Sequence, residues 1–257
     1  MGIINVTPDS FFEGGRTTNQ EDIVAKASTL IDEGATFLDI GGYSSRPGAL
    51  DLSEAEELGR VLPAIESILS AFPKALISID TFRSLVAKTA IEAGACMVND
   101  ISGGQADVNM FEVVGKLKVP YILMHMRGTP QTMATKNNYN NITQELISYF
   151  SARLAVAHKV GINDVVIDPG FGFAKNSAQG FELLNNLELF EVLDVPFLIG
   201  ISRKSMIYKT LDLTPNEALN GTTALNSIAL LKGASIVRVH DVKEAVECVK
   251  LTQKLLF

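Results

Sequence analysis

The chain has 257 residues, 47% hydrophobic and 20% charged, a composition typical of soluble globular proteins. Its formal net charge of −7 argues against a nucleic-acid-binding protein, which needs a basic face. No apolar stretch reaches the roughly 18 residues of a membrane-spanning helix, and no basic segment precedes the first apolar run. Cys96 and Cys248 lack CxxC spacing and suitable histidine neighbours, so we expect packing roles and a cytoplasmic location.

Short apolar runs alternate with amphipathic stretches of helical period. We expect strands near residues 1–7, 36–41, 75–80, 96–101, 120–126, 164–168, 196–201 and 235–240. We expect helices near residues 20–33, 53–72, 83–93, 107–117, 140–160, 177–190, 215–232 and 242–255. This alternation indicates a parallel sheet, and the Val, Ile and Leu runs are typical of strands buried on both faces. We therefore predict a (β/α)₈ TIM barrel, an α/β fold, forming a single domain over residues 1–257.

Glycine and proline mark several helix boundaries. Four glycines each end a helix immediately before a strand, where a left-handed residue is favoured: Gly34, Gly94, Gly161 and Gly233. Ser53 and Glu56 form the pattern of a capping box at the start of the second helix. Pro63 lies inside that helix, so we expect a kink or a break there.

Almost every predicted strand ends on a polar residue. These residues are Asn5, Asp80, Asn99, Asp100, His125, Asp168, Ser202, Arg203, Lys204, Arg238 and His240. Each has an ordinary alternative, such as a helix N-cap for Asp80 or a turn former for Asp168. In a closed barrel, however, the carboxyl ends of all strands surround one mouth. The pattern therefore predicts an enzyme with one polar pocket.

The polar residues divide into two chemical halves. Asp80, Asn99 and Asp168 suit a flat, nitrogen-rich heterocycle, because a carboxylate accepts two parallel N–H bonds. Asn5 lies on the first predicted strand, and Arg238 and His240 lie on the last. These two strands are neighbours in a closed barrel, near where barrels often bind phosphate. Residues 202–205 add two cations and two hydroxyls at a helix start, which favours anions. The sequence predicts a substrate with a heterocyclic head and a phosphate-bearing tail.

Nine motifs occur in the order found in one enzyme family. They are GIINVTPDSF, DIGGYSSRPGA, SIDTFR, VNDISGG, LMHMRGTPQTM, DPGFGFAK, GISRKSMI, NGTTALN and RVHDV. On these motifs the chain resembles dihydropteroate synthases over essentially its whole length. The resemblance implies that 4-aminobenzoate is joined to 6-hydroxymethyl-7,8-dihydropterin diphosphate, giving dihydropteroate and diphosphate in folate biosynthesis. It also implies Mg²⁺ as cofactor, sulfonamide inhibition and a homodimer.

The family's site residues can be carried over to matching positions. The implied pterin pocket comprises Asp80, Asn99, Met124, Asp168 and Lys204. The implied diphosphate contacts are Asn5, which is also the metal ligand, and Arg46, Arg238 and His240. The implied 4-aminobenzoate contacts are Ser45, Pro47, Phe173, Lys204 and Ser205. The implied catalytic set is Asp80, Asp168, Lys204, Arg238 and His240, with catalytic loops at 7–16 and 43–49.

Tyr43 and Ser45 depart from the family pattern, since glutamate and threonine usually occupy these positions. Ser45 keeps the hydroxyl, so we expect the loop contacts to persist. The long connection after the first strand carries Phe11 and Phe12, and is either a lid over the pocket or a plain connector.

Two other functions are compatible with a pterin-binding barrel. A methyltetrahydrofolate-binding methyltransferase domain also recognises pterin, but SSRPG, SRKS and RVH suit an anionic leaving group instead. A catalytically inactive barrel would lack a polar site residue, and this chain has the full set. Because a dihydropterin ring can delocalise positive charge, we favour a dissociative, SN1-like reaction in which Asp80 and Asp168 steady the cation.

Overall fold

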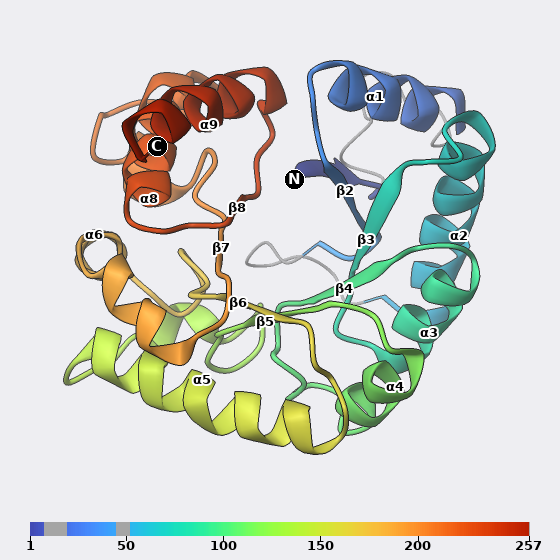
Figure 1. The fold of residues 1–257 in the computed structure, drawn as a ribbon, viewed down its shortest axis with the longest axis horizontal. Coiled ribbons are helices and arrows are strands. Elements are labelled where there is room, and N and C mark those ends of the chain that lie inside the picture. The colour runs from blue at the N-terminus through green and yellow to red at the C-terminus, as the bar shows by residue number, and fades with distance from the viewer. Residues whose placement is uncertain (8–19, 45–51, 257) are drawn as a thin grey trace.

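The computed structural model of the 257-residue chain describes residues 1–7, 20–44 and 52–256. Its strands are β1 (Gly2–Asn5), β2 (Phe37–Gly41), β3 (Leu76–Asp80), β4 (Met97–Asp100), β5 (Tyr121–Met124), β6 (Val165–Asp168), β7 (Leu198–Ile199) and β8 (Ile236–Val237). Strands β1 to β6 form one parallel sheet in chain order, and β7 pairs with β8. Single bridges between Gly2 and Val239 and between Ile167 and Phe197 connect the two sheets. The strands thus close into a ring, which confirms the predicted barrel (Figure 1).

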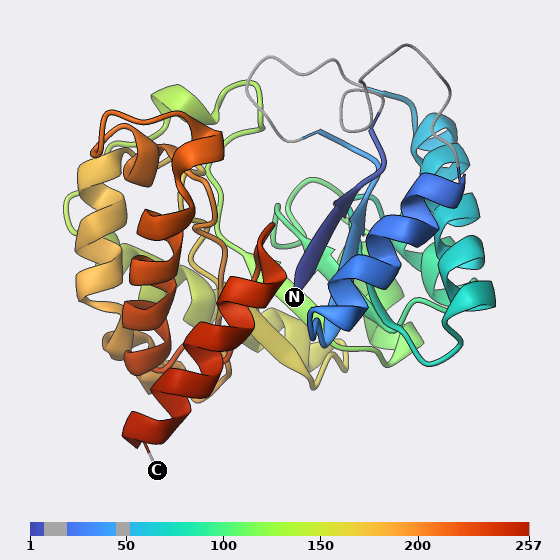
Figure 2. The same ribbon diagram turned by 90° about the horizontal axis from the view of Figure 1, so that it is seen from above.

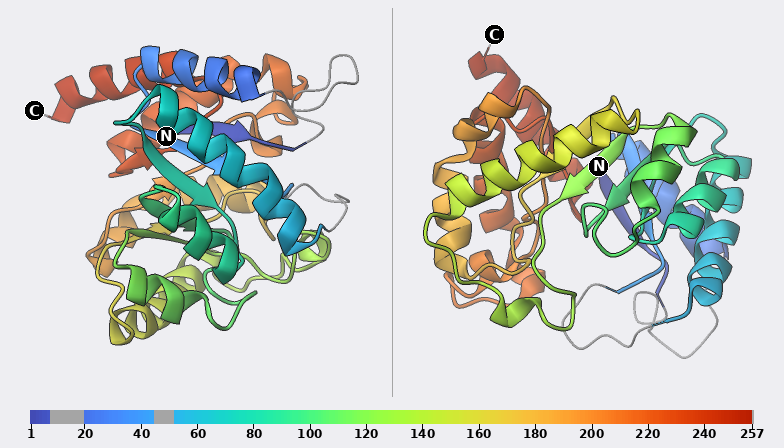
Figure 3. Two further views of the ribbon diagram at one scale, coloured as in Figure 1. Left: turned by 90° about the vertical axis from the view of Figure 1, so that its right-hand side faces the viewer. Right: turned by 90° about the horizontal axis from the view of Figure 1, so that it is seen from below.

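Helices surround the strands (Figures 1 and 2). They are α1 (Gln20–Asp32), α2 (Glu54–Ala71), α3 (Ser84–Glu92), α4 (Met110–Leu117), α5 (Ile142–Lys159), α6 (Ser177–Asn185), α7 (Ser205–Tyr208), α8 (Leu219–Leu231) and α9 (Val242–Leu256). Short 3-10 turns are η2 (Met133–Thr135), η3 (Leu187–Leu193) and η4 (Pro215–Glu217). Figure 3 shows α1, α2 and α3 packed side by side on the outside of the first strands. Among the described residues, no helix is long and apolar enough to cross a membrane.

Two helices differ in detail from the pattern expected. Helix α2 continues through Pro63 as one helix, so of the kink or break predicted there the break does not occur. Its apolar face packs on the barrel through Val61, Ala64, Ile65 and Ile68, all fully buried, and this packing outweighs the lost backbone hydrogen bond. The helix expected over 177–190 instead ends at Asn185, and η3 follows.

The four predicted helix-ending glycines all have positive φ, between 86° and 110°. Such angles are strained for residues with a Cβ atom. Gly34, Gly94, Gly161 and Gly233 therefore confirm the boundaries that the sequence predicted.

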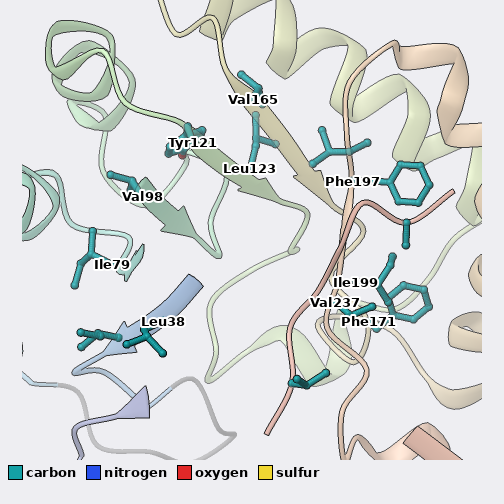
Figure 4. Packing of buried hydrophobic residues seen from close by; sticks show 14 of the residues in the cluster. Leu38, Ile79, Val98, Tyr121, Leu123, Val165, Phe171, Phe197, Ile199 and Val237 are labelled. Carbon is teal, nitrogen blue, oxygen red and sulfur yellow. The ribbon is translucent and has the colours of Figure 1, made fainter. Parts of the chain in front are cut away.

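Side chains alternate between the two faces of each strand. Ile79, Val98, Tyr121, Leu123 and Val165 belong to the large core cluster that includes apolar residues of the surrounding helices (Figure 4). A second, smaller cluster contains Met1, Met97, Ile122, Val166 and Leu198, which occupy the alternate positions and fill the barrel interior.

The same alternation positions the pocket. Asn99, Met124 and Asp168 each lie two residues beyond an interior residue, so they point to the same side but nearer the carboxyl end. A polar layer therefore sits above an apolar floor.

Candidate functional site

Arg238 links three strands at the mouth of the barrel. Its Nε donates to Asp39 Oδ2 at 2.6 Å, and one terminal nitrogen, Nη2, donates to Asp80 Oδ2 at 2.8 Å. Asn99 Nδ2 also donates to Asp39 Oδ2, at 3.0 Å. One guanidinium, two carboxylates and an amide from β2, β3, β4 and the end of β8 thus form a single network.

Burial and the neighbouring charges of this network shift the pKa values of Asp80 and Arg238. The pKa of Asp80 is raised to about 7, chiefly by burial. The positive charge of Arg238 opposes this rise, and the negative charge of Asp39 adds to it. Burial alone would lower the pKa of Arg238, but the Asp39 and Asp80 carboxylates raise it above its ordinary value. Arg238 is therefore a permanent cation beside a carboxyl group that titrates near neutrality.

Asp168 and Lys204 are a second set of ionisable groups that influence each other electrostatically. Asp168 is buried and its Oδ1 accepts the Gly170 N–H at 2.7 Å. Burial raises its pKa, opposed chiefly by Lys204. Lys204 Nζ donates to the Phe171 carbonyl and lies 4.5 Å from the centre of the Phe173 ring. Burial lowers the pKa of Lys204 to about 8, opposed chiefly by Asp168.

His240 and Arg203 follow β8 and β7. The Ser202 hydroxyl lies 3.0 Å from His240 Nδ1 and also accepts the His240 backbone N–H at 3.2 Å. Arg203 instead binds Asp241 through two nitrogens, at 3.0 Å and 2.5 Å. The prediction that residues 202–205 offer two cations to an anion was therefore wrong for Arg203, because its charge is already paired with Asp241.

The other predicted residues occupy varied positions. Asn5 ends β1, where it pairs with Gly41, and is half-buried. Met124 is buried in a cluster whose border includes Phe173. Ser205, half-buried, begins the four-residue helix α7.

His125 is a strand-end residue that does not face the pocket. Its ring is buried against Tyr149 and lies 2.9 Å, through Nδ1, from Lys175 Nζ. Burial lowers the pKa of His125 to about 2. This histidine is a packing residue.

Several predicted contacts lie outside the described residues. They are Ser45, Arg46 and Pro47, together with Phe11, Phe12 and most of the catalytic loops 7–16 and 43–49. Their predicted roles stay predictions.

Asp39 is the residue that the sequence analysis missed. It lies inside β2 rather than at a strand end, and its side chain is fully buried. The available signal was a lone carboxylate within the apolar run FLDIG, because an unpaired charge is rarely buried.

The donors beside Arg238 can accommodate Mg²⁺ only together with a substrate. Asn5 offers one amide oxygen, and no group of three or more His, Cys, Asp or Glu among the described residues could hold a metal ion. Mg²⁺ commonly keeps waters and takes further oxygens from substrate phosphates. The residues therefore fit a metal that binds with a diphosphate.

Comparison with known proteins identifies the class of this site. The family model described as "Pterin binding enzyme" matches residues 1–240. The dihydropteroate synthase of Escherichia coli is 41% identical over 258 residues, covering 100% of this chain and 91% of the relative. The chain therefore belongs to the pterin-binding enzymes, and within them to the dihydropteroate synthase family, as its motifs predicted.

Solved structures agree with this assignment. The Yersinia pestis dihydropteroate synthase with a sulfonamide drug complex has a TM-score of 0.93 and 38% identity, covering 99% of this chain and 93% of that one. The Xanthomonas albilineans dihydropteroate synthase with 4-aminobenzoic acid has a TM-score of 0.92 and 38% identity, covering 99% of this chain and 92% of that one.

Proposed function

We propose that this chain joins 4-aminobenzoate to 6-hydroxymethyl-7,8-dihydropterin diphosphate and releases 7,8-dihydropteroate and diphosphate. The observation that carries the proposal is the Arg238 network, in which a cation meets acceptors for a heterocycle at one barrel mouth. Family membership over the full chain supports the same reaction.

The heterocycle binds among the acceptors. Asp168 Oδ1 is committed to Gly170, whereas Oδ2 makes no hydrogen bond with a described residue and can accept pterin N–H groups. At the other edge of the heterocycle the Asp80 carboxylate accepts hydrogen bonds, and the Asn99 amide accepts or donates them. Met124 and Lys204 complete the pocket. Matched hydrogen bonds contribute strongly to binding in a desolvated pocket of this kind, because each unpaired buried polar group costs about 1–3 kcal/mol of free energy.

The diphosphate binds on the side of Arg238. Arg238 and His240 receive the negative charge, and the family motifs assign Arg46 to the same contact. Asn5 would hold Mg²⁺, which when bound neutralises diphosphate charge.

The reaction proceeds by departure of diphosphate. The bond between the exocyclic methylene carbon and its oxygen breaks, and the electron pair leaves with diphosphate. Asp80 and Asp168 stabilise the resulting dihydropterin cation, and Arg238 stabilises the anion, because preorganised charge is usually the largest catalytic contribution. The aromatic amine then forms the C–N bond and loses one proton to solvent.

The 4-aminobenzoate binds next to the methylene. Phe173 provides an aromatic face and Lys204 a cation 4.5 Å from that ring's centre. The family motifs assign Ser205, Ser45 and Pro47 to the same subsite. The Xanthomonas albilineans relative, which was solved with 4-aminobenzoic acid, supports this substrate.

The decisive experiment incubates purified protein with both substrates and Mg²⁺. We expect diphosphate and dihydropteroate in equal amounts, with a sulfonamide competing against 4-aminobenzoate. A methyltransferase domain would bind methyltetrahydrofolate and release no diphosphate, and an inactive barrel would bind pterin without turnover. Either result would refute the proposed reaction.

We further propose that the chain is a cytoplasmic homodimer. Cys96 and Cys248 are both free thiols, as in a reducing compartment. Exposed apolar side chains occur on two neighbouring elements late in the chain: Leu189 in η3, and Ile228 and Leu231 in α8. Lys232, the C-cap residue of α8, forms an ion pair with Glu188 of η3. An exposed apolar surface shared by neighbouring elements favours an interface between copies of the chain.

A further inference from the structure

Asp39 combines complete burial with bonds to two pocket residues. It lies within β2, and its Oδ2 accepts from both Arg238 Nε and Asn99 Nδ2. A buried carboxylate is unfavourable unless charged or polar partners surround it. Both of its donors belong to the proposed substrate pocket, so the burial of this charge bears directly on the geometry of that pocket.

The carboxylate fixes the direction of the Arg238 guanidinium. A guanidinium is a planar fork whose donors have fixed relative directions. With Nε held by Asp39 and Nη2 held by Asp80, the plane and its rotation are determined. Nη1 makes no hydrogen bond with a described residue, so it is available to an anion.

The carboxylate also fixes the orientation of the Asn99 amide. A carboxylate only accepts hydrogen bonds, so Asn99 must turn its nitrogen toward Asp39 at 3.0 Å. Its carbonyl oxygen therefore points away from Asp39. Without a carboxylate at this position, the amide could rotate and exchange an acceptor for a donor.

We propose that Asp39 is a positioning residue for the transfer reaction, holding Arg238 ready for the leaving diphosphate and Asn99 in one hydrogen-bonding orientation. It acts through these two side chains and does not itself touch the substrates. This inference rests on the proposed function, and it adds a residue inside a strand to a pocket otherwise built from strand ends.

Asp39→Asn tests the proposal with almost no change in side-chain volume. We expect kcat/KM for the pterin substrate to fall at least about tenfold, equivalent to about 1.4 kcal/mol. KM for 4-aminobenzoate should stay within about twofold, because none of its proposed contacts among the described residues, Phe173, Lys204 and Ser205, bonds to Asp39. Affinity for inorganic diphosphate, measured by calorimetry, should fall with kcat/KM.

Ser78→Ala is the matched control. Ser78 pairs with Asp39 in the β2–β3 register, is fully buried, and its hydroxyl has no hydrogen-bond partner among the described residues. We expect wild-type kinetics from this variant. Wild-type kinetics from Asp39→Asn would overturn the proposal, as would equal losses in both variants.

A double-mutant cycle separates positioning from a general structural effect. Arg238→Gln leaves Asp39 without its cation, whereas Asp39→Asn with Arg238→Gln removes both charges. We expect the double variant to have a higher thermal midpoint than Arg238→Gln and the same residual diphosphate affinity. Additive losses of affinity would show that Asp39 does not act through Arg238.

If Asp39→Asn alone fails to fold, the comparison of the double variant with Arg238→Gln still tests the proposal. Asp80 loses its Arg238 partner equally in both of these proteins, so they differ only in the buried charge of Asp39. The cycle also separates the two proposals. If the wild type formed no dihydropteroate, the proposed reaction would fail, while diphosphate affinity and the stability cycle would still judge Asp39.

Discussion

The two oxygens of Asp168 have different surroundings. Oδ1 accepts the Gly170 N–H, so the turn that the sequence suggested is present, while Oδ2 is left for a ligand. In Asp168→Asn the amide oxygen can keep the turn, but an NH₂ group then faces the pterin N–H. We expect pterin affinity, measured by calorimetry, to fall at least about tenfold, or about 1.4 kcal/mol, with little change in thermal midpoint. Wild-type pterin affinity would return Asp168 to a purely structural role.

Asp100→Asn is the contrasting variant. Asp100 is fully buried and accepts from the Ser102 backbone and hydroxyl, from the Gly104 backbone and from the Tyr121 hydroxyl. All its bonds are internal to the fold. We therefore expect a lower thermal midpoint, and unchanged pterin affinity in the protein that remains folded.

From the pKa values of Asp80 and Lys204 we predict a bell-shaped pH dependence of kcat/KM. The pKa of Asp80 is raised to about 7, first by burial, and the charged groups acting on it are Arg238, Asp39, Glu57 and Asp100. The pKa of Lys204 is lowered to about 8. If the ionised carboxylate and the protonated amine are active, activity rises through about pH 7 and falls above about pH 8.

The alkaline limb can be assigned by substitution. Lys204→Arg keeps its charge throughout, since the pKa of arginine lies above about 12. We expect its kcat/KM, whatever its height, to show no fall above about pH 8. A persistent alkaline limb would rule out Lys204 as its source.

Sequence reasoning at the residue scale succeeded where a strand ends. Asp80, Asn99 and Asp168 lie around one mouth because barrel closure brings strand ends together. It missed Asp39, whose bonds to Arg238 and Asn99 cross the barrel, and it misassigned Arg203, which pairs with Asp241. Both pairings depend on which strands become neighbours in the folded chain.

At the scale of elements, two helical glycines should respond oppositely to alanine. A Cβ at Gly115, in α4, would meet the Val160 carbonyl oxygen at 2.3 Å, whereas a Cβ at Gly59, in α2, would meet nothing within 4 Å. We expect Gly115→Ala to destabilise the fold by about 1–3 kcal/mol. Gly59→Ala should stabilise it by about 0.5–1 kcal/mol, through helix propensity alone. Denaturant unfolding measures both, and equal effects would contradict the packing argument.

Element boundaries were predictable where a residue imposes a backbone angle. The helix-ending glycines did so, and Ser53 with Glu56 forms the expected capping box. Pro63 did not break α2, since the buried face of the helix decides its course. Helix α7 has only four residues, too short for a periodic pattern to reveal.

At the scale of the molecule, alternation of apolar runs and helical stretches was enough to predict the barrel. The strand order β1 to β6 follows the chain, which is the simplest solution for repeated βα units. What the pattern could not supply is whether copies of the chain associate and through which surface, because an exposed apolar residue looks the same in sequence as a buried one.

Helix α8 carries the clearest test of association. Ile228 and Leu231 lie one turn apart on its exposed face, with Ala224 one turn before them. A stable interface buries about 800 Å² per partner and tolerates a charge at its centre poorly. We expect Ile228→Glu to give a monomer in sedimentation equilibrium, at concentrations where the wild type is a dimer. Val108→Glu is the control, because Val108 is 90% exposed and lies before α4, away from α8 in the chain. A wild-type monomer, or an Ile228→Glu dimer as tight as the control, would remove this face from consideration.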